Sequence, residues 1–264
     1  MQLLRPALFI SLSVFLISAS SGAQPPPQRD PQAVDILEKS FLAMGGPRSQ
    51  AISDITIMGR TITQRATDQI QGAVTVKLAG RGKSRIDIQT GSETTSYVAN
   101  GNEVAEVTGG KSQRLPYHTT INKHSSHLPV FSEIADRNDL SYRLFYKGVE
   151  TINGKSTHHI RIEKEFPGRP PDKAKILGDL SAADLFIDTT SYLLVKRARQ
   201  VPSVGDAKDT IVVEYYYSDY RAIAGIAVPH LISFYGRGQK ISEINITSVA
   251  VDTGINALEF EVQK

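Results

Sequence analysis

The stretch VVEYYYSDYRAIAGIAVPHLISFY, from Val212 to Tyr235, decides the fold of this chain of 264 residues. Six aromatic side chains lie within this hairpin-sized segment, although the chain contains no tryptophan: Tyr215, Tyr216, Tyr217, Tyr220, Phe234 and Tyr235. Successive side chains of a strand point to opposite faces, so Tyr215 and Tyr217 share one face and Tyr216 lies on the other. Both faces are therefore partly apolar, which is typical of a central strand in a curved sheet. The aromatic side chains form either a packed sheet core or the wall of a ligand site.

The same period of two continues on both sides of this stretch. Apolar and polar residues alternate in GAVTVKLAG and SRIDIQT, between residues 72 and 90, and this pattern predicts half-buried strands. Asn100-Gly101, Asn153-Gly154 and Gly236-Arg237-Gly238 are typical hairpin turns. The pattern predicts about ten or eleven antiparallel strands, and a sheet of that size curls rather than staying flat.

Two helices are expected among the strands. Asp30 and Pro31 are typical of a helix start and indicate a helix over residues 31–45, and a second, short helix is expected over residues 126–137. In each segment the apolar residues recur every three or four positions: Val34, Leu37, Phe41 and Met44 in the first, and Leu128, Phe131 and Ile134 in the second. Residues 166–179 are rich in proline and glycine and are expected to form a loop. The predicted fold class is mainly β (α+β): one strongly curved antiparallel sheet, or incomplete β-barrel, with helices packed on its concave face.

The first residues resemble an export signal. Residues 1–23 contain Arg5, a short apolar run and small residues at Ser21 and Ala23, so cleavage is expected after Ala23. The apolar run is shorter than the roughly 20 residues that span a membrane, although an uncleaved anchor is the alternative interpretation. Residues 24–30 are expected to form a proline-rich tether, and residues 31–264 a single domain. The mature protein is therefore expected in the periplasm or outside the cell, in soluble and monomeric form.

Composition excludes several classes of function. The chain has no cysteine, which excludes thiol catalysis, disulfides and attachment of a lipid to a cysteine. Its 30 basic and 27 acidic residues are mixed along the chain, which argues against nucleic-acid binding. No catalytic, cofactor-binding or metal-binding motif is present, and the spacing of His124 and His127 is not typical of a zinc site. We therefore expect a protein that is not an enzyme and that holds no cofactor or metal.

The order of elements resembles that of a known family. The leading helix DPQAVDILEKSFLAMGG, the pair LFIDTTSYLLVKRARQ and the closing segments up to ISEINITSVAVDTGINALEFEV are similar to the lipoprotein-carrier superfamily, the LolA/LolB-like group. This group includes the outer-membrane lipoprotein-sorting proteins. The resemblance implies an incomplete β-barrel whose helices form a lid over an apolar cavity for acyl chains. It also implies an arginine in the cavity that helps to hold the lid closed.

These observations lead to one main functional expectation and two alternatives. The main one is an exported, non-enzymatic binder or carrier of a lipid or an acylated protein in the bacterial periplasm. The first alternative is an interaction or sensor module of the same fold with a protein partner, which could be membrane-associated, and the second is a hydrolase. The residues expected to contact the lipid are Val34, Leu37, Phe41, Leu128, Phe131, Ile134, Tyr215, Tyr217, Ile232, Phe234, Ile244 and Ile246.

Overall fold

The computed structural model describes residues 28–64, 67–80, 82–101, 103–115, 128–202 and 209–262. The expected signal segment, the first part of the expected tether and His124 and His127 lie outside these residues. No helix in the described part of the chain has both the length and the apolar character to cross a membrane.

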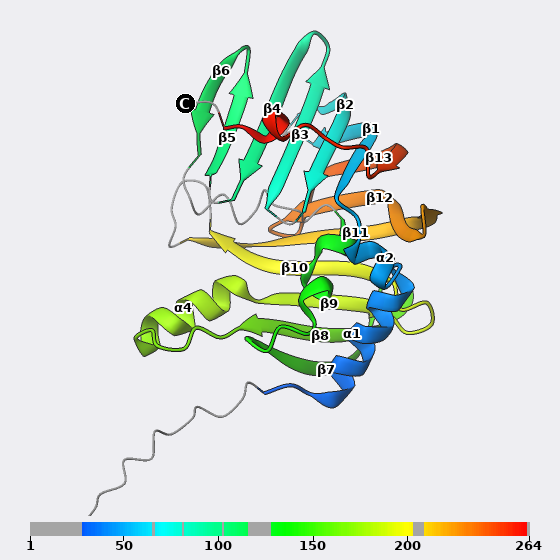
Figure 1. The fold of residues 1–264 in the computed structure, drawn as a ribbon, viewed down its shortest axis with the longest axis vertical. Coiled ribbons are helices and arrows are strands. Elements are labelled where there is room, and N and C mark those ends of the chain that lie inside the picture. Colours follow the sequence, from blue (N-terminus) through cyan, green and yellow to red (C-terminus); the bar gives the residue numbers. More distant parts are fainter. Residues whose placement is uncertain are drawn as a thin grey trace, which may run out of the picture.

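The strands of the described chain form one antiparallel sheet of thirteen strands (Figure 1). They are β1 (Asp54–Gln64), β2 (Gln69–Ala79), β3 (Lys83–Thr90), β4 (Glu93–Asn100), β5 (Glu103–Thr108), β6 (Lys111–Arg114), β7 (Tyr142–Ile152), β8 (Lys155–Lys164), β9 (Ala183–Asp188), β10 (Leu194–Pro202), β11 (Thr210–Ile223), β12 (Ile226–Gly236) and β13 (Gln239–Val251). Their order across the sheet is β6-β5-β4-β3-β2-β1-β13-β12-β11-β10-β9-β8-β7. Because β6 and β7 lie at the two edges, the sheet is open, as the sequence predicts. The count exceeds the expected ten or eleven, and the edge strand β6 lies outside every expected strand.

The aromatic stretch forms the hairpin β11–β12 near the middle of the sheet. Ala224 and Gly225 at its tip have φ angles of 47° and 84°, and two successive positive values are typical of the tight turn that suits the twist of paired strands. The turn fixes the register, so Tyr215 lies opposite Phe234 and Tyr217 lies opposite Ile232. The expected hairpin turns at Asn100-Gly101, Asn153-Gly154 and Arg237-Gly238 are confirmed by the strand boundaries on either side of each.

The helices within the described residues are short. They are the α-helices α1 (Pro31–Ala43), α2 (Pro47–Gln50) and α4 (Pro171–Ser181), and the 3-10 helices η2 (Pro129–Phe131), η3 (Glu133–Asp136) and η4 (Ala257–Phe260). The α1 helix begins as predicted, because the side chain of Asp30 accepts a hydrogen bond from the backbone N–H of Gln32, and Pro31 is the first helical residue. Figure 1 shows α1, η2 and η3 in front of the half of the sheet that contains β7 to β12.

Two expected elements are wrong in detail. The single helix expected over residues 126–137 is, within the described residues, two 3-10 helices separated by Ser132. Pro129 favours an extended conformation at Leu128, and extended Ser132 starts the second turn, where its hydroxyl oxygen accepts from the N–H of Ile134. The loop expected over residues 166–179 contains most of α4, since Pro171 occupies the first helical position, where proline is favoured, and Lys175 pairs with Asp179 one turn later.

The topology explains why the 3-10 helices cross the sheet. Strands β6 and β7 follow one another in the chain but lie at opposite edges of the sheet, and the structure describes residues 128–141 of the connection between them. The described part of this connection contains η2, which contacts β12, and η3, which contacts α1. We call residues 128–137 the cover, and the face of the sheet beneath it the inner face.

The two ends of the described chain are attached to the sheet. The backbone of residues 28–30 runs parallel to β7: Asp30 N donates to Leu144 O and Leu144 N donates to Gln28 O, each at 3.0 Å. At the other end, the buried carboxylate of Asp54 accepts hydrogen bonds from the backbone N–H groups of Thr253 and Gly254. These bonds lead the chain to η4, which contacts β3 and β4 and buries Phe260 completely.

Candidate functional site

The inner face is a continuous apolar surface. Of the twelve residues expected to contact a lipid, nine are buried members of one core cluster: Leu37, Phe41, Leu128, Phe131, Ile134, Tyr215, Tyr217, Ile232 and Ile246. Phe234 and Ile244 are half-buried and pack against the same cluster. The structure therefore brings these eleven side chains together, from α1, the cover and strands β11 to β13. Whether they contact a lipid is taken up below as a proposal.

Val34 is the exception, because 36% of its surface is exposed. The buried face of α1 contains the small residues Ala33 and Ser40 together with Ile36, Leu37 and Phe41. Small residues allow the helix to approach the sheet closely, and they turn its contact face away from Val34. The sequence pattern favoured Val34 because it recognises apolar residues and overlooks small ones on a helix face.

The aromatic side chains of β11 divide between the two faces. Tyr215 and Tyr217 are 6% and 3% exposed on the inner face, and the ring centroid of Tyr215 lies 5.0 Å from that of Phe234. Tyr216 lies on the outer face, where its ring meets that of Tyr235 at 5.1 Å. Burial raises the pKa of Tyr217 well above its ordinary value, so this hydroxyl stays protonated at neutral pH. The sequence did not determine which side chains of β11 face inward. The structure shows that Tyr215 and Tyr217 do.

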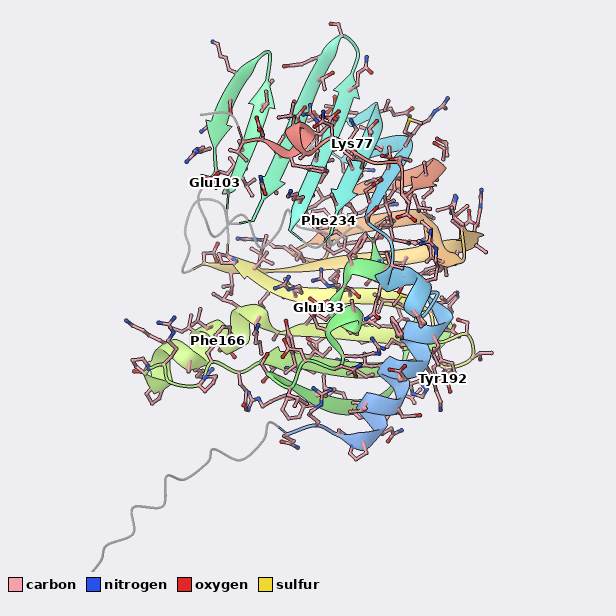
Figure 2. All side chains as sticks on the ribbon, in the orientation of Figure 1. Lys77, Glu103, Glu133, Phe166, Tyr192 and Phe234 are labelled. Atoms are coloured by element: carbon pink, nitrogen blue, oxygen red, sulfur yellow. The ribbon has the colours of Figure 1, made fainter. Side chains whose placement is uncertain are left out.

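A buried ion pair attaches the cover to the sheet. Glu133 of η3 accepts hydrogen bonds from Arg197 of β10, at 2.8 Å from Nε and 2.5 Å from Nη2 (Figure 2 labels Glu133). Both residues are less than 9% exposed. Burial opposes ionisation of Glu133, but the charge and hydrogen bonds of Arg197 outweigh it and lower the pKa of Glu133 to about 2. Both groups therefore remain charged at neutral pH.

A second contact joins the cover to α1. The guanidinium of buried Arg137 lies 3.3 Å from the ring centroid of Phe41 and forms an ion pair with Glu38. Arg29, in the segment beside β7, donates to the carbonyl oxygen of Arg137 and, at 2.8 Å, to that of Asp139. The middle of the cover and its C-terminal end are thus held mainly by arginine side chains.

Sequence patterns missed the inner-face arginines Arg197 and Arg199. The stretch LLVKRARQV is apolar at both phases near its start, and a bulge lies between Leu194 and Lys196. The bulge lets Leu194 and Arg197 both face inward, although they are three residues apart. Arg199 follows in the same phase and lies opposite Val213 of β11. The spacing of Arg197 and Arg199 indicates that they share one face of a strand. The sequence does not reveal the bulge, so it could not tell which face that is.

The outer face carries a polar network of histidine, arginine and carboxylate side chains, the groups from which a hydrolase site could be built. His159 lies 2.6 Å from Glu150 and 2.9 Å from Asp184, and its ring stacks on Phe186 at 4.4 Å. Burial lowers the pKa of His159, but hydrogen bonds to Asp184 and Glu150 outweigh this and leave the pKa raised. Glu163 is paired with Arg143 and Arg161. Each of these acids thus has a structural partner, and the described residues contain no group of three or more side chains arranged to hold a metal ion.

A cavity of about 340 Å³ lies beside α4, away from the eleven clustered residues. Its walls are residues 163–169 together with Arg143 of β7 and Ala174, Lys175, Gly178 and Asp179 of α4. Phe166, which Figure 2 labels beside α4, is its aromatic side chain. The lining is largely charged, so this cavity differs in character from the apolar cavity that the sequence resemblance implies.

Comparison with known proteins gives likeness in fold. No family model and no curated protein sequence matches the chain. A solved structure of a domain assigned to the outer membrane lipoprotein-sorting proteins, from Vibrio parahaemolyticus, superposes with a TM-score of 0.58 at 12% identity and covers 87% of this chain and 96% of that one.

Two further solved structures have related shapes. A DUF1329 family protein from Desulfovibrio piger gives a TM-score of 0.56 at 12% identity, with 88% of this chain and 99% of that chain covered. A LolA superfamily protein from Nitrosomonas europaea gives 0.48 at 13% identity, with 82% and 92% covered. The expected resemblance is confirmed at the level of the fold, because this chain superposes over most of its length on the lipoprotein-sorting domain.

Proposed function

We propose that the chain is an exported, non-enzymatic binder or carrier of a lipid or an acylated protein, and that it works in the bacterial periplasm. The acyl chain would lie on the inner face among the eleven clustered residues, in place of part of the cover. The shared fold with a lipoprotein-sorting domain supports this proposal, and the export signal expected at residues 1–23 supports the location.

One observation carries the proposal: the cover is attached to the sheet by a buried ion pair. A buried pair gains Coulomb energy but loses the hydration of both charges, so apolar side chains of similar size often give greater stability. When such a cover lifts, Arg197 and Glu133 regain their hydration, which offsets much of the lost attraction. An ion pair is therefore suited to a segment that closes and opens repeatedly.

The energetics of an acyl chain fit this arrangement. Burial of each CH₂ group contributes about 0.8 kcal/mol. An acyl chain that replaces the cover on the apolar face therefore compensates for the burial lost by side chains such as Phe131 and Ile134. Binding stays reversible because the cover competes with the ligand for one surface. The large apolar side chains of the cover, Leu128, Val130, Phe131 and Ile134, are all less than 8% exposed, and they are thus both the closed-state core and the competitor of the ligand.

Native mass spectrometry tests the proposal. The full chain is produced with its N-terminal segment in a bacterium, purified without detergent from the periplasm, and weighed under native and denaturing conditions. We expect extra mass that matches a lipid or an acyl chain and that disappears on denaturation. A protein that carries no such mass, and that does not take up a fatty acid offered at micromolar concentration, would exclude the carrier function.

Two phenylalanines of equal burial supply a matched pair of variants. Phe131 of the cover is 7% exposed on the inner side, and Phe186 of β9 is 6% exposed but stacks on His159 on the outer face. We expect Phe131→Ala to change the amount of retained lipid, and Phe186→Ala to leave it unchanged. Equal effects would mean that lipid retention reflects general stability rather than the inner face.

The alternative function is an interaction module with a protein partner, and one feature favours it. Helix α4 has no buried residue and presents Ile176, 58% exposed, and Leu177, 37% exposed. If the protein retains no lipid, this helix is the first surface to examine for a partner, by testing whether Ile176→Asp abolishes its capture.

A further inference from the structure

The two inner-face arginines of β10 differ in their partners. Arg197 is matched by Glu133, whereas the guanidinium of Arg199 donates one hydrogen bond, from Nη2 to the carbonyl oxygen of Leu180 at 3.1 Å. The Nε of Arg199 is buried and has no hydrogen-bond partner. Within the described part of the chain, no carboxylate lies within 4.0 Å of this guanidinium. Among the described residues, β10 therefore places two guanidinium groups on the inner face, and the ion pair with Glu133 matches only one of them.

An unmatched guanidinium in this position is costly for the folded protein. Arg199 is half-buried, so its guanidinium loses part of its hydration without gaining an ion pair, and its buried Nε–H without an acceptor adds to the penalty. Burial and the like charge of Arg197 lower the pKa of Arg199. A leucine or methionine at position 199 would avoid these costs, so the packing of the inner face alone gives no reason for an arginine.

The surroundings of Arg199 show where an anion could approach. Leu180, which accepts its single hydrogen bond, follows directly after Gly178 and Asp179, which line the cavity beside α4. Lys164, another wall residue, also has no carboxylate within 4.0 Å among the described residues, and its ammonium lies 5.5 Å from the ring centroid of Tyr142. Tyr142 is also close enough to Arg199 to affect its pKa. Two unmatched cations thus lie near the same end of α4.

We propose that Arg199 binds the anionic head group, a carboxylate or a phosphate, of an amphiphile whose hydrocarbon chain lies on the inner face. This inference rests on the carrier function proposed above and narrows its ligand from lipids in general to anionic ones. A guanidinium offers parallel N–H groups that match the two oxygens of a carboxylate or phosphate, and the free Nε–H of Arg199 would belong to such a fork. The head group would supply the counter-charge that the inner face lacks, while the neighbouring side chains of Val213 and Tyr215 lead toward the apolar cluster.

A competition experiment with matched ligands tests this inference. The purified full chain is loaded with the neutral fluorescent probe N-phenylnaphthylamine, and palmitate, hexadecyl phosphate and hexadecanol are added below their micelle concentrations. We expect either anion to displace the probe at a concentration at least about ten times lower than hexadecanol, since tenfold corresponds to about 1.4 kcal/mol. In Arg199→Gln this preference should disappear while hexadecanol binding persists, and Arg199→Lys should keep part of it.

Controls separate the head-group contact from folding and from net charge. Arg221→Gln removes one positive charge at an exposed position paired with Asp219, and should keep the full preference for anions. Urea unfolding should find Arg199→Gln no less stable than the wild type, because Arg199 forms no ion pair that the substitution would break. The ratio of anion affinity to hexadecanol affinity is the decisive quantity. If Arg199 had a purely structural role, its substitution would weaken the binding of both kinds of ligand equally.

The outcomes distinguish this inference from the function on which it rests. If hexadecanol and the anions displace the probe equally well from the wild type, the head-group site is refuted and the carrier function stands. If none of the three ligands binds, the carrier function itself fails. Inorganic phosphate is tested alone: if it stabilises the wild type but not Arg199→Gln, and the amphiphiles show no preference, Arg199 binds a free anion and the head-group proposal is overturned.

Discussion

At the scale of single residues, the inner face combines apolar packing with the charges of Glu133, Arg197 and Arg199. Glu133 and Arg197 compensate each other, and the pair attaches a segment that would otherwise be held by apolar side chains alone. The carboxylate also partly offsets the charge of Arg199. Removal of Glu133 would therefore leave Arg197 unpaired and would increase the positive charge around Arg199.

The first prediction concerns this carboxylate. Glu133→Gln should lower the free energy of unfolding by about 1–3 kcal/mol, less than is usual for a broken buried ion pair, because Arg197 loses its partner but regains hydration when the cover lifts. The double variant Glu133→Leu with Arg197→Met removes both charges and should recover most of that stability. Urea unfolding followed by circular dichroism measures both, with Asp219→Asn, at an exposed ion pair, as a control that should barely move the midpoint. A small loss in Glu133→Gln would mean that the pair does not hold the cover.

The second prediction is the pH dependence of the same pair. The pKa of Glu133 lies at about 2 in the folded protein, below its ordinary value of 4.5. A lowered pKa means that the stabilisation is fully present above about pH 4.5 and is lost as the pH falls toward 2. The difference in unfolding free energy between wild type and Glu133→Gln should therefore shrink from about pH 6 to about pH 2. Because the other carboxylates are common to both proteins, a constant difference would contradict the assignment.

At the scale of elements, sequence patterns predicted what depends on local periodicity. The strands, the hairpin turns and the start of α1 follow from alternation, Asn-Gly pairs and a helix cap, all of which act over a few residues. The helix expected in the cover and the loop expected at α4 were wrong because the effect of a proline depends on its position. Pro129 interrupts a helix, whereas Pro171 begins one. The inward position of Arg197 depends on a bulge. The position of its partner Glu133 depends on a chain connection between opposite edges of the sheet. Neither can be read from periodicity, because both are consequences of the whole topology.

The third prediction compares the cover with the permanent core. Phe131→Ala should cost less stability than the 2–5 kcal/mol expected for Leu185→Ala, although both side chains are buried. Leu185 lies in β9, within the sheet, so its cavity persists as long as the protein is folded. The stability lost in Phe131→Ala cannot exceed the free energy of lifting the cover. If the cavity would cost more than that, the cover stays open while the sheet remains folded. Urea unfolding compares the two variants, and equal losses would identify the cover as ordinary core.

At the scale of the whole molecule, the open sheet must protect two edge strands. An exposed edge presents unpaired backbone N–H and C=O groups that invite pairing with another copy. The β6 edge is four residues long and wholly polar, with Lys111 and Arg114 at its ends. The β7 edge is longer and includes fully buried Leu144, and residues 28–30 occupy the hydrogen-bonding positions of that residue. The short segment before α1 thus protects the more vulnerable edge.

The last prediction follows from this protection. Arg29 holds the segment in place by donating to carbonyl oxygens of the residues before and within β7, including those of Asp139 and Tyr142. Arg29→Ala should loosen residues 28–30, expose the N–H and C=O of Leu144 and promote pairing between copies through β7. Sedimentation velocity should show a monomeric wild type and concentration-dependent association of the variant, while Arg169→Ala, in the wall of the cavity beside α4, remains monomeric. If Arg29→Ala also stays monomeric at high concentration, β7 is protected by its twist and charges, and the segment before α1 serves only to start the helix.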